Sequence, residues 1–81
     1  MSLMEKSIGD ALVELRKKTL QQIQVETAYK WSGRACAAAI LGSMDDAKEY
    51  AHEAIEHAAL SGDDSLLAEV RRAHARFGIQ V

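Results

Sequence analysis

The sequence contains no proline, one cysteine and few aromatic residues, which make up 5% of its 81 residues. Without proline, no residue ends a helix through a missing backbone N–H. Cys36 has no second cysteine with which to form a disulfide inside the chain. The sequence also has no secretion leader and no apolar run of about 18 residues, so we expect a cytoplasmic protein without a membrane span.

The residues that are abundant are strong helix formers, chiefly Ala, Leu, Glu, Lys, Gln and Arg, whereas strand-favouring clusters are scarce. The composition therefore predicts one all-α domain over residues 1–81. We expect residues 1–6 to be flexible or to derive from an expression vector. A chain this short buries only about 60% of the surface of its unfolded form, and a second copy could supplement its thin core.

Two glycine-centred breaks divide the chain, Gly42-Ser43 and Ser61-Gly62, and a pair of aspartates follows each of them. Glycine readily adopts the left-handed conformation that ends a helix, while Ser and Asp can cap the N-terminus of the next one. The breaks predict three helices, at about residues 7–41, 45–60 and 64–77. The last two helices carry apolar side chains at helical spacing. These are Ala47, Tyr50, Ala51, Ala54 and Ala58 in the second helix, and Leu66, Val70, Ala73 and Phe77 in the third.

The predicted first helix is unusually long, since helices of globular proteins average about 11–12 residues. Its apolar residues keep roughly helical spacing as far as Leu41, although residues 21–27 are mostly polar. The helix therefore either bends or breaks near residues 21–33, or its first half projects and pairs with another molecule. We favour a long first helix with or without a bend.

Small residues on both sides of the first break predict an antiparallel helical hairpin. The first helix carries Ala35, Ala37, Ala38 and Ala39, and the returning helix carries an alanine stripe, so the two can approach closely. This arrangement resembles a tetratricopeptide repeat over about residues 28–61. The matching residues are Trp31, Ala35, Gly42, Asp45, Asp46, Ala47 and Ala54. The sequence departs from that pattern at Arg34, Ala38, Met44 and Ala51, has no proline after the second helix, and contains only one such unit.

The resemblance implies a hairpin, followed here by a capping helix, that binds a peptide or a partner helix mainly along its first helix. The corresponding surface would include Lys30 and Arg34, and also Ala37 or Leu41. Trp31, Leu20 and Ile23 add apolar surface that so short a chain can hardly bury completely. We therefore expect a partner-binding surface at Leu20, Ile23, Lys30, Trp31 and Arg34, and a homodimer or a complex with a partner helix.

Two alternative functions come from other clusters of residues. Glu49 and His52 have the three-residue spacing at which a carboxylate and an imidazole can share a metal ion, and Glu53 and Glu56 lie nearby. Ordinary exposed Glu and His residues on a polar helix face would show the same spacing. We therefore expect no metal ion or other cofactor. The segment Val70–Phe77 is basic and could contact nucleic acid through Arg71, Arg72 and Arg76. The acidic middle of the chain and the isoelectric point near 5.9 oppose that interpretation.

Catalysis is not expected from this sequence. It contains no glycine-rich phosphate loop, no Gly-x-Ser-x-Gly segment and no His-Glu-x-x-His helix. Cys36 lies between alanines, as a buried packing cysteine does, and no sequence pattern links it to a histidine. The sequence thus predicts a small non-catalytic interaction module that associates with itself through its long first helix.

Overall fold

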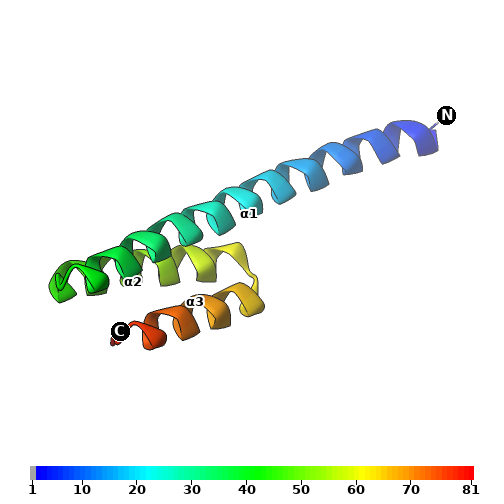
Figure 1. The fold of residues 1–81 in the computed structure, drawn as a ribbon. Coiled ribbons are helices and arrows are strands. Elements are labelled where there is room, and N and C mark those ends of the chain that lie inside the picture. Colours follow the sequence, from blue (N-terminus) through cyan, green and yellow to red (C-terminus); the bar gives the residue numbers. More distant parts are fainter. Residues whose placement is uncertain (1) are drawn as a thin grey trace.

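Three α-helices make up the chain in this computed structural model (Figure 1). The structure describes the backbone of residues 2–81 and the side-chain surroundings of residue 9 and of residues 11–81. The helices are α1 (Ser2–Ile40), α2 (Met44–Ser61) and α3 (Asp64–Arg76), and residues 2–81 contain no strand. The predicted all-α fold with a long first helix is confirmed.

Helix α1 is continuous over its 39 residues, so the considered break near residues 21–33 does not occur. It begins at Ser2, earlier than the predicted start at residue 7, and Met1 lies outside the described residues. The side chains of Ile8 and Asp10, at the predicted start, also lie outside them. Gly33 does not interrupt the helix, because a glycine in a helix interior costs only about 1 kcal/mol relative to alanine.

The first turn reverses the chain at Gly42, whose φ of 82° is left-handed. The amide of Ser43 donates to the carbonyl of Ala38 across this turn at 2.9 Å, which satisfies a free carbonyl of α1. Ser43 occupies the N-cap position of α2, but its hydroxyl makes no capping hydrogen bond. The predicted side-chain cap is therefore missing here. Asp45 and Asp46 lie in the first turn of α2, where their charge complements the helix dipole.

The second turn has the predicted stop and cap. Gly62 ends α2 with a φ of 75°. Asp63 precedes α3, and its Oδ1 accepts a hydrogen bond from the amide of Leu66 at 3.1 Å. The side chain of Asp63 thus satisfies one of the free N–H groups at the start of α3.

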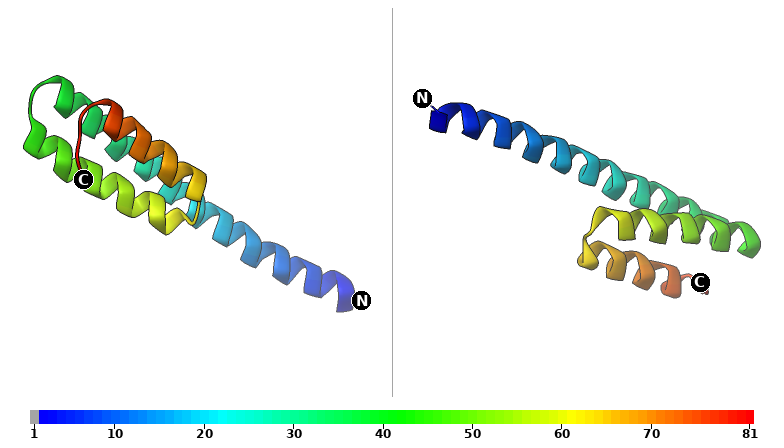
Figure 2. Two further views of the ribbon diagram at one scale, coloured as in Figure 1. Left: turned by 90° about the horizontal axis from the view of Figure 1, so that it is seen from below. Right: turned by 180° about the vertical axis from the view of Figure 1, so that it is seen from behind.

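Helix α2 runs antiparallel to the second half of α1, and α3 packs against both helices (Figure 2). The alanine stripe of α2 is fully buried, as predicted: Ala47, Ala51, Ala54 and Ala58 each have no exposed surface. Ala28 and Ala35 of α1 are equally buried. Two small apolar clusters form, one containing Leu66 and Val70 and the other containing Ile79. The predicted hairpin is therefore present, with alanine at its centre.

The third helix departs from its predicted stripe at its C-terminal end. Leu66 and Val70 are buried, but Phe77 is 40% exposed. Because α3 ends at Arg76, Phe77 leaves the helical register, and Ile79 enters the core in its place. The amide of Ile79 donates to the carbonyl of His74 at 2.9 Å, which closes the turn at the C-terminal end of α3.

The first half of α1 extends beyond the other two helices (Figure 1). Gln21 marks the boundary, because its side-chain Nε2 donates to the carbonyl of Ser61, the last residue of α2, at 2.9 Å. We call residues 2–20 the α1 overhang. All its side chains from residue 11 to residue 20 are exposed. The overhang explains the elongated shape of the molecule, 62 × 16 × 13 Å.

Candidate interaction surface

A shallow hollow of about 370 Å³ lies between α1 and α2 near the first turn. It is lined by Arg34, Ala37, Ala38, Leu41, Ser43, Asp46 and Tyr50. Leu41 is 81% exposed. The hollow has apolar lining residues together with the guanidinium of Arg34 and the carboxylate of Asp46. Such a lining is suited to an apolar side chain from a partner protein.

An aromatic pair borders this hollow. The ring centroids of Trp31 and Tyr50 are 5.7 Å apart, and their planes are inclined by 32°. The guanidinium of Arg34 lies 5.0 Å from the centroid of the Trp31 ring, within cation–π range. Trp31 is only partly buried, so the pair joins the core to the surface. Tyr50 and Arg34 thus both lie close to the indole ring.

A second hollow of about 340 Å³ lies where the α1 overhang leaves the hairpin. Its lining residues are Lys17, Leu20, Gln21, Gln24 and Leu60. On α1, Lys17, Leu20 and Gln24 of the second hollow and Arg34, Ala38 and Leu41 of the first follow one stripe, with Trp31 between them, at spacings of three, four and seven. Such spacing keeps residues on one side of a helix. Both hollows therefore lie along the same flank of the hairpin.

The α2 side of this flank is acidic. Asp46, Tyr50, Glu53, His57 and Leu60 follow each other at spacings of four and three. His57 Nδ1 donates to Gln24 Oε1 at 2.6 Å, and His57 Nε2 lies 3.9 Å from Glu53 Oε2. We call this flank, formed by the stripe on α1 and these five residues of α2, the seam face. It carries the carboxylates of Asp46 and Glu53.

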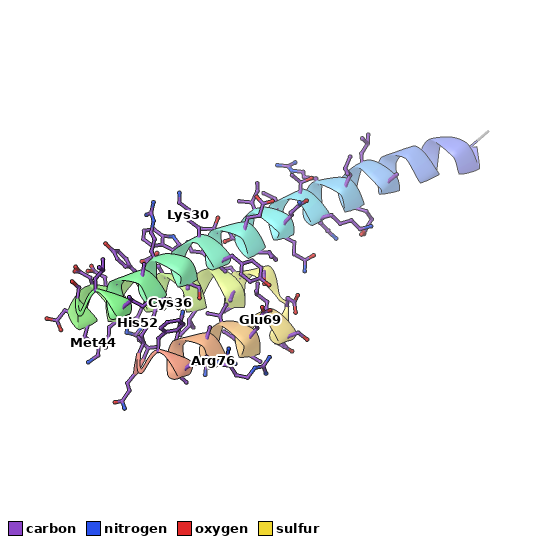
Figure 3. All side chains as sticks on the ribbon, viewed as in Figure 1. Lys30, Cys36, Met44, His52, Glu69 and Arg76 are labelled. Carbon is purple, nitrogen blue, oxygen red and sulfur yellow. The ribbon has the colours of Figure 1, made fainter. Side chains whose placement is uncertain are left out.

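The five predicted partner-binding residues do not form a single patch. Trp31 and Arg34 lie on the seam face beside the first hollow, and Leu20 lines the second. Ile23 is half exposed but lines neither hollow. Lys30 is exposed and extends from α1 away from α2 and α3 (Figure 3). Ala37 and Leu41, suggested by the tetratricopeptide resemblance, both line the first hollow.

The residues proposed for metal binding are not gathered by the fold. Glu49, His52 and Glu56 are exposed on α2, and Glu53 contacts His57. In the described part of the chain, no three histidine, cysteine or acidic side chains are placed so that they could hold one metal ion. The helical spacing of these residues is thus not matched by ligands from a facing helix.

The basic residues of α3 are placed at its surface. Arg71, Arg72 and Arg76 are all exposed. Arg72 and Arg76 line a hollow of about 330 Å³ together with Glu69 and Ala73. A carboxylate therefore shares this small basic surface, which weakens its attraction for phosphate.

A buried polar pair was not predicted from the sequence. Ser32 Oγ of α1 lies 3.1 Å from His74 Nε2 of α3, and both residues are buried. His74 Nδ1 is buried without a hydrogen-bond partner. Because burial removes hydration from the charged form, it lowers the pKa of His74 below its usual 6.5. The signal available in the sequence was spacing, since His74 follows Val70 by four residues on the buried side of α3.

Cys36 offers no activated nucleophile. It is partly buried, and desolvation raises the pKa of its thiol. A higher pKa keeps the thiol protonated at neutral pH and lowers its reactivity. The observed environment suits a packing role for this side chain.

Comparisons of the chain with protein-family models, curated proteins and solved structures found no match. Within the described residues, no helix has both the length and the apolar character that a bilayer crossing requires. The interpretation of the chain therefore depends on its own geometry.

Proposed function

We propose that this chain is a small non-catalytic module of the cytoplasm that binds other proteins, and first of all a second copy of itself, through α1. The observation that carries the proposal is the α1 overhang, half of a 39-residue helix with no helix of the same chain beside it. Most helices in proteins owe their stability to packing of an apolar face. The overhang has apolar side chains but nothing to pack them against.

The exposed apolar surface is large enough to support association. Large apolar residues from position 12 to position 23 are each at least half exposed: Leu12, Val13, Leu15, Leu20 and Ile23. Complete burial of such a side chain contributes about 1.5–3 kcal/mol, so the exposed half of each leaves roughly 1 kcal/mol. Burial of all five in both copies would contribute at most roughly 10 kcal/mol. This gain is comparable with the 4–15 kcal/mol that association costs, so we expect a reversible dimer.

The resemblance to a tetratricopeptide hairpin supports the same class of function. In that family, partners lie along first helices, and here Arg34, Ala37 and Leu41 of α1 line the first hollow. A partner helix or peptide is therefore part of the proposal. The helical hairpin also provides a rigid support for such a surface, because alanine allows α1 and α2 to pack closely.

The test is light scattering across a wide dilution range. The chain has a mass of 8.9 kDa, and we expect the mass to approach twice that value on concentration. Light scattering is preferred to elution volume because a monomer 62 Å long elutes early. Val13→Glu combined with Leu20→Glu should keep the protein monomeric, whereas Ala75→Glu, at an exposed position of α3, should not. A wild-type protein that stays monomeric at every concentration would refute self-association.

A further inference from the structure

The α1 overhang and α2 have almost the same length. Residues 2–20 of α1 span about 28 Å, and the 18 residues of α2 span about 27 Å, at 1.5 Å per residue. Each chain therefore has a free helical segment and, beside it, a hairpin flank of matching length. Two copies placed antiparallel can each lay the overhang along the hairpin of the other.

The stripe on α1 continues from the hairpin into the overhang along one side of the helix. On the seam face, the stripe of α1 runs from Leu41 back to Leu20 and Lys17, and the same spacing of four reaches Val13. Val13 is 54% exposed and Leu20 is 57% exposed. A two-fold interface requires one surface to meet itself in reverse. The stripe meets this requirement, because Val13 and Leu20 of one copy can face the part of the stripe near Gln24 and Trp31 in the other copy.

The charges on the two segments are complementary. The overhang carries Arg16, Lys17 and Lys18 against Glu14 among its described side chains. The α2 side of the seam face carries Asp46 and Glu53, and its α1 side carries Arg34. Within one chain most of the overhang lies beyond the end of α2 (Figure 1). An antiparallel second copy brings each basic overhang beside an acidic flank and so selects this register.

We propose that the occupant of the seam face is the α1 overhang of a second copy, in a two-fold antiparallel dimer. This inference rests on the proposed function and specifies its partner and its surface. The overhang of one copy lies between α1 and α2 of the other, with Val13 and Leu20 toward the stripe on α1. Arg16 and Lys17, which share that side of the overhang at spacings of three and four, lie toward the α2 side of the seam face with its carboxylates. The exchange is reciprocal, so both overhangs are covered.

The test is a charge exchange between two variants. The acidic variant combines Arg16→Glu with Lys17→Glu, and the basic variant combines Asp46→Lys with Glu53→Lys. Each variant alone places like charges together, and its dimer dissociation constant should rise about tenfold or more. In an equimolar mixture, each overhang meets a flank of opposite charge, and heterodimers should form with close to wild-type affinity. Light scattering measures the mass, and circular dichroism at each step verifies that the variants are folded.

A control variant carries the same charge change away from the seam face. Arg71→Glu with Arg72→Glu, on the exposed surface of α3, should dimerise like the wild type. Raised salt should weaken the repulsion within each test variant and bring its dissociation constant closer to the wild-type value.

The outcomes separate the inference from the proposed function. If the wild type and both test variants all form dimers of similar affinity, the docking on the seam face is overturned. Self-association would then stand, for example through overhangs that pair only with each other. The docking is also overturned if the mixture stays monomeric although each variant is folded. A monomeric wild type at every concentration would overturn both proposals.

Discussion

His74 makes the fold sensitive to mild acid. Its side chain is 1% exposed, its Nε2 pairs with Ser32, and burial lowers its pKa. The folded chain therefore keeps His74 neutral, whereas the unfolded chain takes up a proton as the pH falls below about 6.5. Because the unfolded state then binds more protons, stability is complete above that pH. It is lost as the pH falls from the unfolded pKa toward the lower folded pKa.

The size of the effect follows from one proton. The free energy of unfolding should fall by at most about 1.4 kcal/mol per pH unit in this window. For 81 residues, a total stability of about 4–12 kcal/mol is typical, so a loss of this size is a sizeable part of it. Urea unfolding followed by circular dichroism, between about pH 7 and pH 5 at constant protein concentration, measures it. Most carboxylates titrate near pH 4 and lie largely outside this range.

Two variants isolate the contribution of His74. His74→Gln removes the titrating group and should abolish most of the pH slope, whatever its effect on stability at pH 7. His52→Gln, at an exposed position of α2, should keep the slope. An unchanged slope in His74→Gln, or its loss in His52→Gln, would refute the assignment.

Two further predictions concern stability and need only urea unfolding. Ala51→Leu inserts a large side chain at a position of zero exposure and should lower the free energy of unfolding by about 1–3 kcal/mol. Ala59→Leu, at an exposed position of α2, should change it by less than about 0.5 kcal/mol. Equal losses in the two variants would contradict the close approach of α1 and α2. Asp63→Ala removes the hydrogen bond to Leu66 and should cost about 1 kcal/mol. Ser43→Ala should cost clearly less because the Ser43 hydroxyl caps nothing, and the reverse order would contradict the capping geometry.

The sequence predicted the helices well because their signals are local. Gly42 and Gly62 stop helices through their own backbone conformations, and Asp63 caps through a residue three positions away. Alanine spacing likewise predicted which side of α2 is buried. Ser43 shows the limit of this reasoning, because its residue type suits a cap but its hydroxyl does not make the bond.

The surface was harder to predict because it depends on packing between distant segments. Trp31 and Arg34 were singled out from the sequence, yet their contact with each other and with Tyr50 depends on how α1 and α2 align. Ile79 was missed, since it lies after α3 and enters the core only through the C-terminal turn. The buried pair of Ser32 and His74 was also missed, because the two residues are 42 positions apart in sequence.

Helix α1 joins two environments in one continuous backbone. The hairpin holds its second half and so supplies the costly nucleus from which the α1 overhang continues by adding one hydrogen bond per residue. In a monomer, amide hydrogen exchange should therefore be fast over residues 11–20 and slow around Ala28 and Ala35, with a step near Gln21. A second copy lying on the overhang would slow exchange there and remove the step, so the backbone itself reports whether the helix is covered.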